Sequence, residues 1–391
     1  MGSSKSRTLE AQTAIEEADL LIGAKRMIEA CQRPGQDCFV EYNSEKIAAY
    51  IAEHPEYEKV AVVLSGDPGF CSGAKKLLDV LGEKVKVIAG TSSVSYFMSK
   101  LQKSWDDVLL TSVHGKENNL PGMIKRHKKV FAILGTRDGI QNLARDLVTW
   151  GMEDVMLYTG ERLSYENEVL KTGKPEEFLD YEADALSVVY VENPKAEPEN
   201  ATHGIPDEEF LREKVPMTKE EVRTVSLSKL QLKEDSVCYD VGAGTGSVSI
   251  EMAKRAWKGR VFAIEKKPLA VELLKKNRKK FAAENLEVIE GMAPEALEDL
   301  ETPTHAFIGG SSGNMETILN LLLNKNPKVR MVINCIALET VAETLACLKK
   351  LPVKETEILQ LAVSKAKTVG AYHMMMGENP IYIISCTGAG H

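Results

Sequence analysis

The chain has 391 residues, of which 43% are hydrophobic and 27% are charged. This length is too great for one ordinary hydrophobic core and fits two domains of about 200 residues each. A net charge of −8 and a pI of about 5.6 exclude a general basic field for nucleic acid or anionic membranes. No apolar run reaches the roughly 18 residues of a membrane span and no secretory leader pattern is present, so we expect a cytoplasmic protein with no membrane or nucleic-acid partner.

Six apolar runs in the first half predict β-strands, and most of them are followed by a turn of small residues. The runs occupy residues 60–65, 85–89, 108–112, 130–134, 155–158 and 186–192. Helical patterns alternate with the runs, which indicates parallel sheets with crossover helices. Ligands of open α/β sheets bind outside the carboxyl ends of the strands, so these turns are the candidate sites.

Five of these turns carry distinctive sequences, which read GDPGF, AGTSSVSYF, SVHGKEN, AILGTRDG and YTGERLSYENE. Taken alone, Asp67-Pro68-Gly69 would be an ordinary β-turn, and Ser92 with Ser93 would be a helix N-cap. In this order the five turns resemble the class III tetrapyrrole methylases, most specifically those that methylate carbon 5 of a cobalt-precorrin. The resemblance covers roughly residues 1–192.

The resemblance implies a class III methylase fold with a site for S-adenosylmethionine. Seven residues match that site, the last two beside the adenosine: Gly66, Asp67, Pro68, Ser92, Ser93, Leu134 and Gly160.

The start of the chain matches the same family only in part. Class III methylases open with a short apolar strand and a glycine-rich turn, and here Met1–Ser3 resemble the end of that turn. We therefore expect the first strand to be missing, the sheet to be incomplete and carbon-5 methylation to be weak. The alternative is that this Gly-Ser sequence is left over from an expression tag.

Residues 193–203 are predicted to link a domain of residues 1–192 to a domain of residues 204–391. The surrounding stretch, VENPKAEPENATHG, carries Pro194 and Pro198, several acidic residues and no apolar periodicity. The two halves use different glycine-rich turns, so the domains are not repeats of one another.

The second half predicts another α/β sheet and a terminal hairpin. TKEEVRTVSLSKLQL has helical spacing, with Thr218 as N-cap and Glu221 completing a capping box. The strands SVCYDV, RVFAIE, LEVIEG and HAFIGG follow. The chain then closes with VKETEILQLAV, a polar loop and PIYIISCTG, and we expect the two apolar runs to pair antiparallel.

The first of these strands ends in a glycine-rich turn, DVGAGTG. Glycine permits positive φ and close approach of the backbone to a ligand. The spacing is G-x-G-x-G, and the third glycine of the dinucleotide pattern would fall on Ser247, which disfavours nicotinamide binding. Glu265 ends the next strand, where a carboxylate can accept hydrogen bonds from both ribose hydroxyls. Met292 and Ala293 follow the third strand and offer adenine an apolar wall.

Together these features resemble the class I S-adenosylmethionine-dependent methyltransferases, with Asp240 toward the amino-acid end of the ligand. The stretches IGGSSGNM and GIPDEEFLREKVPMTKEEVR resemble the family that methylates carbon 15 of a precorrin with decarboxylation, over roughly residues 203–391. By this resemblance the cofactor-binding residues are Thr218, Asp240, Gly242, Ala243, Gly244, Thr245, Gly246, Glu265, Met292 and Ala293.

Both halves in one chain resemble the bifunctional precorrin-6Y C(5,15)-methyltransferases (decarboxylating) of cobalamin biosynthesis. That family implies two sites for S-adenosylmethionine, a precorrin-6B or precorrin-7 type substrate and a homo-oligomer. Methyl transfer needs alignment of carbon and methyl more than a nucleophilic side chain, so we assign no catalytic residue.

A precorrin carries many carboxylates, so cations should line its clefts. The candidates are Lys116, Arg137 and Arg162 in the first domain, with Lys219, Arg223, Lys365, Lys367 and His373 in the second. Met374–Met376 beside His373 would either cover the macrocycle or form an inter-subunit core. The basic run at residues 275–280 is interpreted as a solvated helix face.

Two other hypotheses remain at this stage. Only the second domain would be active, with the first serving for binding or assembly, or the second domain would be a generic class I methylase of RNA or a small molecule. The N/D-P-P-Y/F tetrapeptide of amide-nitrogen methylases is absent, which disfavours nucleic acid.

No metal site is predicted. The seven cysteines contain no C-x-x-C pair, and we interpret them as buried, reduced thiols.

Overall fold

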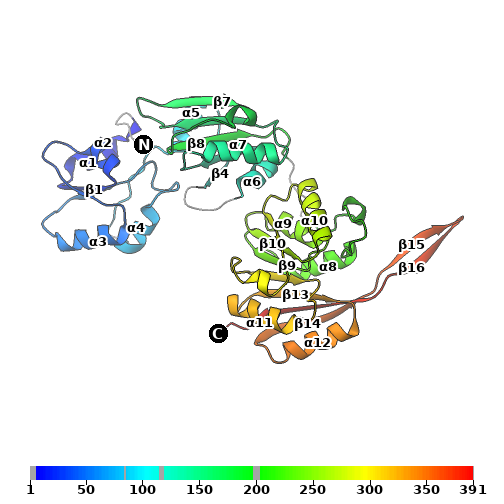
Figure 1. Cartoon of the computed structure of the whole chain (residues 1–391). Helices are drawn as coiled ribbons and strands as arrows, with labels where there is room; N and C mark the ends of the chain where they lie inside the picture. Colours follow the sequence, from blue (N-terminus) through cyan, green and yellow to red (C-terminus); the bar gives the residue numbers. More distant parts are fainter. Residues whose placement is uncertain (1–5, 83–84, 114–118, 197–202, 391) are drawn as a thin grey trace. The chain divides into compact units, whose positions relative to one another are not determined.

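The structure is a computed structural model that describes residues 6–82, 85–113, 119–196 and 203–390. It divides into two compact units (Figure 1). The first comprises residues 1–117 and 127–196, and the second comprises residues 118–126 and 197–391. The expected turn at Met1–Ser3 lies outside the described residues.

The first unit begins with a small parallel sheet of order β2-β1-β3, formed by β1 (Leu20–Gly23), β2 (Asp37–Val40) and β3 (Val60–Val63). Its helices are α1 (Leu9–Glu17), α2 (Lys25–Cys31), α3 (Ser44–Glu53) and α4 (Ala74–Leu81). Successive residues of β1 point to opposite faces, so Leu21 packs in one apolar cluster while Leu20 and Ile22 pack in another.

A second sheet of the first unit has the order β4-β5-β8-β6-β7. Its strands are β4 (Leu109–Ser112), β5 (Lys129–Ile133), β6 (Met156–Glu161), β7 (Val169–Gly173) and β8 (Ser187–Glu192), accompanied by α5 (Ser93–Leu101), α7 (Gly139–Thr149) and the short η3 (Pro175–Phe178). Only β4 and β5 pair in parallel. The expectation of purely parallel sheets is wrong here, because the short connection from β6 to β7 leaves no room for a crossover helix.

The run at residues 85–89 was predicted to be a strand and is not one in the described structure. Its β-branched residues favour extended backbone, but a strand also needs a neighbour to complete its hydrogen bonds. The other five strand predictions of this half are confirmed within a few residues.

The second unit is built on a seven-stranded sheet of order β11-β10-β9-β12-β13-β17-β14. Its strands are β9 (Val237–Val241), β10 (Arg260–Glu265), β11 (Leu286–Glu290), β12 (His305–Ile308), β13 (Arg330–Cys335), β14 (Val353–Leu361) and β17 (Ile381–Gly388). The pairings among β9 to β13 are parallel, whereas β17 runs antiparallel to β13 and β14. The predicted antiparallel terminal pair is therefore confirmed.

Helices cover both faces of this sheet, and an apolar core lies on each face. They are α8 (Glu220–Leu230), α9 (Ser247–Arg255), α10 (Pro268–Lys280), α11 (Met315–Lys325) and α12 (Leu338–Leu348), with the short turns η4 (Asp207–Glu209) and η5 (Glu295–Leu297). The helix α6 (Leu120–Arg126) also belongs to this unit, since Lys125 Nζ donates to the carbonyl oxygens of Phe281 and Ala282 at 3.2 and 3.3 Å.

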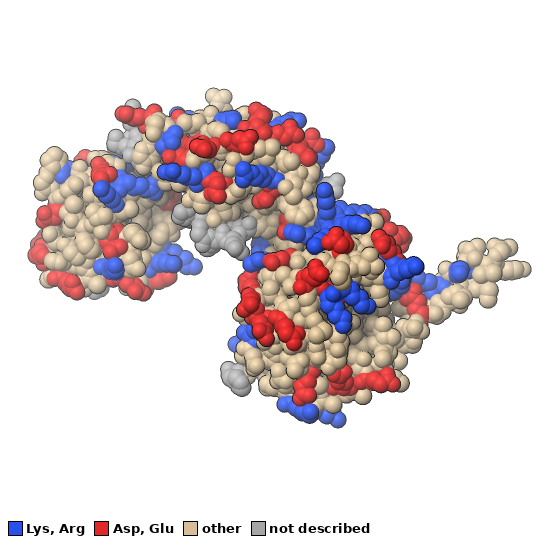
Figure 2. Space-filling model, in the orientation of Figure 1, with Lys and Arg blue, Asp and Glu red and all other residues tan. Residues whose placement is uncertain are grey.

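The polar loop predicted between β14 and β17 is instead a hairpin of β15 (Ser364–Val369) and β16 (Tyr372–Gly377). It extends away from the sheet, and its end is mostly uncharged in the space-filling view (Figures 1 and 2). Every residue of both strands is exposed.

Three further findings concern the sequence predictions. Helix α8 begins at Glu220 with Lys219 as N-cap and no capping side chain, so the predicted capping box is wrong. The Glu221 carboxylate instead pairs with Lys365 at 2.6 Å. Cys238, Cys335 and Cys386 are buried as expected, but Cys38 and Cys71 are exposed. Among the described residues no helix is long and apolar enough to span a membrane.

Candidate active sites

The glycine-rich turn of the second unit joins β9 to α9. Gly242, Gly244 and Gly246 all have positive φ, of 78°, 56° and 79°. An added Cβ on Gly242 would lie 3.0 Å from the Gly310 backbone. The turn therefore requires glycine for conformation and for space, as the sequence predicts.

Asp240 lies at the end of β9, beneath this turn, and is 1% exposed. Its Oδ2 accepts a hydrogen bond from the Ser249 hydroxyl, while Oδ1 is buried with no partner among the described residues. The Thr245 hydroxyl is buried and unpartnered in the same way. Burial raises the pKa of Asp240 to about 7. Since unpaired buried polar atoms are costly, a polar or cationic ligand group would stabilise this arrangement.

Glu265 is held rigidly at the end of β10. Its Oε2 accepts from the Gly244 amide at 2.9 Å, and its Oε1 accepts from the Lys267 amide at 2.9 Å. Each carboxylate oxygen keeps further acceptor capacity for the two hydroxyls of a ribose.

The loop after β12 closes the other side of the turn. Ser312 accepts from Lys266 Nζ at 2.9 Å, and Asn314 Nδ2 donates to the Ala293 carbonyl at 3.0 Å. Ala293 is buried, whereas Met292 is 44% exposed. Neither Gly310 nor Asn314 was predicted from the sequence as a site residue, although both lie in the run IGGSSGNM.

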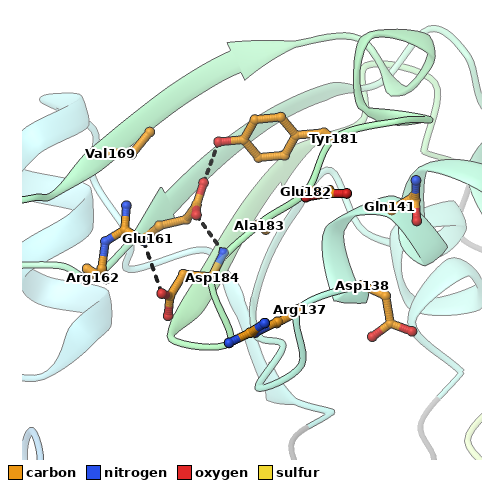
Figure 3. A pocket seen from close by; sticks show the side chains of 10 residues that line it. All are labelled: Arg137, Asp138, Gln141, Glu161, Arg162, Val169, Tyr181, Glu182, Ala183 and Asp184. Carbon is orange, nitrogen blue, oxygen red and sulfur yellow. Dashed lines mark hydrogen bonds and ion pairs between the residues drawn. The ribbon is translucent and has the colours of Figure 1, made fainter.

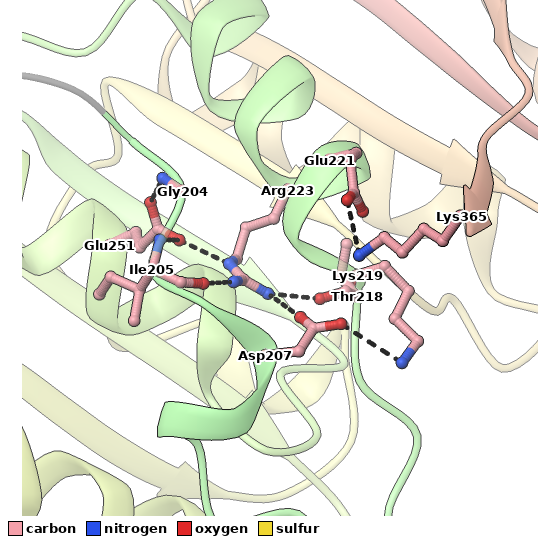
Figure 4. A network of polar contacts seen from close by, with 9 residues as sticks. All are labelled: Gly204, Ile205, Asp207, Thr218, Lys219, Glu221, Arg223, Glu251 and Lys365. Atoms are coloured by element: carbon pink, nitrogen blue, oxygen red, sulfur yellow. Dashed lines mark hydrogen bonds and ion pairs between the residues drawn. The ribbon is translucent and has the colours of Figure 1, made fainter. Parts of the chain in front are cut away.

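Arg223 is no longer a candidate for substrate carboxylates, because its side chain is fully buried. Figure 4 shows its guanidinium directed at groups of the same unit. Nε donates to Glu251 at 2.5 Å, and Nη1 donates to the Thr218 carbonyl at 2.6 Å. A lone arginine in a sequence does not reveal partners 28 residues away.

The remaining cations of the second unit lie at its surface. Lys219 Nζ is 3.3 Å from Asp207 Oδ2, and Lys365 pairs with Glu221. Lys367 of β15 and His373 of β16 are both exposed. The two strands pair in the hairpin, with Lys367 in register with Met374.

In the first unit, Asp67 joins the two predicted cofactor turns. Its Oδ1 accepts from the Gly69 amide at 2.8 Å, and its Oδ2 accepts from the Gly90 amide at 3.1 Å. Gly66 has a φ of 82°, and a Cβ on Gly90 would lie only 2.3 Å from the Gly66 carbonyl oxygen. Pro68 follows Asp67 in the turn. The two turns are thus brought together, as expected for one site.

Ser92 is the N-cap of α5, with its hydroxyl accepting from the Ser95 amide at 3.1 Å, and Ser93 is the first residue of that helix. The N-cap interpretation is therefore confirmed.

Leu134 and Gly160 are both buried. The Leu134 amide donates to the Ser187 carbonyl at 3.1 Å, and a Cβ on Gly160 would lie 2.6 Å from the Phe97 ring. Gly160 is thus required by packing on that side.

A cavity of about 580 Å³ in the first unit is lined in part by two of the predicted carboxylate-binding residues, Arg137 and Arg162 (Figure 3). Arg162 Nη1 pairs with Asp184 at 3.0 Å, and Glu161 accepts hydrogen bonds from Tyr181 and the Asp184 amide. Burial, with the Glu161 hydrogen bond, raises the pKa of Tyr181 to about 12.

The lining of this cavity includes the four acidic residues Asp138, Glu161, Glu182 and Asp184. Acids therefore outnumber arginines, and Arg137 is better placed than Arg162 to meet a ligand carboxylate. Lys116 lies outside the described residues. Among the described residues, no group of three or more His, Cys, Asp or Glu side chains is placed to hold a metal ion.

Comparison with known proteins agrees with this geometry. Residues 209–387 match the family described as a precorrin methyltransferase domain, and residues 1–179 match the tetrapyrrole (corrin/porphyrin) methylases. A protein named probable cobalt-precorrin-6B C(15)-methyltransferase (decarboxylating), from Sulfurisphaera tokodaii, is 43% identical over 188 residues, which are 46% of this chain and 95% of that relative. The chain belongs to the precorrin methyltransferases.

Two other precorrin methyltransferases show the same extent of similarity. The cobalt-precorrin-6B C(15)-methyltransferase (decarboxylating) of Salmonella typhimurium is 40% identical over 182 residues, covering 46% of this chain and 94% of the relative. A crystal structure of a precorrin-6Y C5,15-methyltransferase from Geobacter metallireducens aligns with 39% identity and a TM-score of 0.45, covering 47% of this chain and 95% of that chain. The two family matches show that the chain joins a tetrapyrrole methylase domain to a class I precorrin methyltransferase domain, both of S-adenosylmethionine-dependent families.

Proposed function

We propose that this chain methylates a precorrin or cobalt-precorrin at carbons 5 and 15 and removes the carboxyl group of the ring C acetate. Domain 1–192 would act at carbon 5 and domain 204–391 at carbon 15, with residues 193–203 as linker. The observation that carries the proposal is the glycine-rich turn of the second unit, where buried polar atoms of Asp240 and Thr245 have no hydrogen-bond partner in the described part of the chain.

The second domain would bind S-adenosylmethionine along that turn. Asp240 and Thr245 would meet the amino-acid end, Glu265 the ribose, and Met292 with Ala293 the adenine. Thr218, Ala243 and the three turn glycines would complete this site.

The first domain would hold a second S-adenosylmethionine at the paired turns. Gly66, Asp67 and Pro68 form one side, Ser92 and Ser93 the other. Leu134 and Gly160 would lie near the adenosine. The joining of the two turns through Asp67 supports this proposal.

The proposed chemistry rests on alignment. S-adenosylmethionine would supply an electrophilic methyl group. An electron-rich bridging carbon of the macrocycle would bond to this methyl as the sulfur–methyl bond breaks, and the electron pair of that bond would leave with the sulfur of S-adenosylhomocysteine. In the decarboxylation, the bond to the carboxyl carbon breaks, carbon dioxide leaves, and the electron pair stays with the ring system until a proton is taken up. The protein's part is to hold the macrocycle in line at close distance.

Surface cations would orient the substrate carboxylates. Arg137 in the first domain and Lys219, Lys365, Lys367 and His373 in the second are the candidates. The pairs of Lys219 and Lys365 with acidic residues are partly exposed. Exposed ion pairs contribute roughly 0–1 kcal/mol, so a substrate carboxylate can displace them.

We also propose that the protein is a cytoplasmic homo-oligomer assembled through the β15–β16 hairpin. Tyr372 is 77% exposed and Met375 66% exposed, which is unusual for apolar side chains. A two-stranded hairpin alone is only marginally stable in water. The hairpin carries Lys367, and Lys365 that pairs with Glu221, but no acidic residue, while the chain has a net charge of −8, so a second copy offers Lys367 complementary charge. Sedimentation of a Tyr372→Ser, Met375→Ser variant should show a smaller species; an unchanged mass would contradict the assembly mode.

Incubation with S-adenosylmethionine and precorrin-6B, or its cobalt form, tests the function. The product should carry two added methyl groups and lack one carbon dioxide. The relatives that bear the carbon-15 name match about half of this chain, which favours one alternative: methylation at carbon 15 alone. That product would contradict the bifunctional proposal.

A further inference from the structure

Residues 204–219 precede α8 as one segment, which we call the strap. Apart from the short η4 it contains no helix or strand. Only Thr218 of this segment has a proposed role in cofactor binding. The strap nevertheless contacts α8, α9, α10 and the glycine-rich turn, all within the second unit.

The beginning of the strap is fixed by Glu251 and Arg223 (Figure 4). The Glu251 carboxylate accepts from the Gly204 amide at 2.9 Å, from the Ile205 amide at 3.2 Å and from Arg223 Nε. The side chains of Arg223 and Glu251 are 0% and 2% exposed. Removing one partner of a buried charged pair is costly, because the other charge stays buried and unpaired. Here the pair also bonds backbone groups of the strap.

Arg223 also fixes the end of the strap. Its other nitrogens donate to the Ile205 and Thr218 carbonyls and to Asp207 Oδ1 at 3.2 Å. The guanidinium lies 4.8 Å from the centre of the Phe210 ring. One planar side chain therefore joins both ends of the segment through a rigid fork of donors.

Asn277 of α10 connects the middle of the strap to the glycine-rich turn. Its Oδ1 accepts from the Leu211 amide at 2.9 Å, and its Nδ2 donates to the Leu211 carbonyl at 2.8 Å and to the Thr245 carbonyl at 2.9 Å. The side chain is fully buried, although lysines surround it in the sequence.

The strap reaches the turn directly as well. The Pro216 carbonyl oxygen lies 3.0 Å from where a Cβ on Gly244 would stand, and Val215 packs with Ala270 and Leu273 of α10. Any shift of the strap would therefore move the wall beside Gly244.

We propose that Arg223 and Asn277 are positioning residues for the cofactor site of the second unit. They hold the strap against the glycine-rich turn and thereby place Thr218 and Pro216 beside the bound nucleoside. The proposal rests on the proposed function, because it takes this turn as the S-adenosylmethionine site.

A matched pair of variants tests the role of Asn277. Asn285 also donates to three backbone carbonyls, but these belong to Ala253, Ala256 and Gly259, which lie outside the strap and the glycine-rich turn. In carbon-15 methylation, Asn277→Ala should raise the KM for S-adenosylmethionine about tenfold, as loss of about 1.4 kcal/mol implies, with kcat changed less than twofold. Asn285→Ala should leave this KM unchanged. Equal KM values for both variants would overturn the proposal.

Arg223→Lys provides the second variant, since it keeps the charge but loses the fork. It should raise the same KM and leave kcat nearly unchanged, while Arg223→Met should be worse than Arg223→Lys.

Hydrogen exchange in the unmodified protein tests the strap without any variant that must fold. Addition of S-adenosylmethionine should slow exchange of the amides from Ile205 to Met217, and unchanged exchange despite binding would refute the inference. Absence of S-adenosylmethionine binding by the unmodified protein would instead refute the proposed function itself.

Discussion

The proposed cofactor sites of the two units satisfy their polar groups in different ways. In the first unit, both carboxylate oxygens of Asp67 bond backbone amides, and the Ser92 hydroxyl caps α5. In the second unit, one oxygen of Asp240 and the Thr245 hydroxyl are buried without partners among the described residues. In the first unit, the polar side chains thus form hydrogen bonds that stabilise the turns themselves. In the second unit, buried polar atoms of the turn remain available to bond a ligand.

This difference indicates at which of the two sites a bound ligand should contribute more binding free energy. A ligand that satisfies buried groups recovers the cost of their desolvation, which is about 1–3 kcal/mol for a hydrogen-bonding group. We therefore expect tighter binding of S-adenosylmethionine at the second site, and the following changes should separate the two sites.

Gly90→Ala should have the largest effect and should act on the first site alone. The new Cβ would lie 2.3 Å from the Gly66 carbonyl oxygen, so the two turns must separate. Carbon-5 methylation should fall below detection, as measured from product masses. Gly73→Ala is the control, since no atom of the described residues lies within 4 Å of its added Cβ. Equal loss in both variants would contradict this reason.

Asp240→Ala should weaken binding at the second site by about 10- to 100-fold, as expected for a hydrogen bond to a charged group. Calorimetric titration with S-adenosylmethionine should then reveal one strong site fewer. If both sites keep their affinities, Asp240 does not face the ligand.

The pH dependence of binding should come next in size. The pKa of Asp240 is about 7 in the folded protein, raised by burial, so a cationic ligand must displace its proton below that pH. Affinity at the second site should rise about tenfold between pH 6 and pH 8 and level off above pH 8. Asp240→Asn should flatten this profile, and a wild-type profile already flat would contradict the assignment.

The same group has an opposite effect on folding. Because the folded pKa exceeds the usual value of 3.8, the folded state binds the proton more tightly between pH 4 and pH 7. Its contribution to the free energy of unfolding therefore falls as pH rises through this window. Thermal unfolding of wild type and Asp240→Asn across the window measures this difference.

Ser92→Ala should have the smallest effect. Loss of the N-cap should cost about 1 kcal/mol of stability, while affinity at the first site changes less than threefold. A large loss of affinity with unchanged stability would show that Ser92 serves the ligand more than the helix.

The sequence predicted best those features that local geometry requires. The glycine-rich turn, Glu265 at the end of β10 and the antiparallel pair of β14 and β17 all leave short-range signals. The strand predicted at residues 85–89 is wrong, because strand formation depends on a neighbouring strand that is distant in the sequence.

Arg223 and Asn277 show why the site was only partly predictable. The role of Arg223 depends on Glu251 and on the strap, which no local pattern reveals. Asn277 was hidden in a basic run, yet it follows Leu273 by four residues and Leu274 by three, which places it on the buried face of α10. That spacing was the available signal.

The central claim is that one chain carries two separate methyl-transfer sites. The most direct test compares three proteins: the unmodified protein, Gly90→Ala and Asp240→Ala. Each is incubated with S-adenosylmethionine and the precorrin substrate, and the mass and methyl positions of the product are measured. Unmodified protein should add two methyl groups and release one carbon dioxide, Gly90→Ala should retain only the methyl at carbon 15, and Asp240→Ala at limiting S-adenosylmethionine should retain mainly the methyl at carbon 5. Loss of both methyl groups in either variant, without loss of folding in the other unit, would contradict the claim.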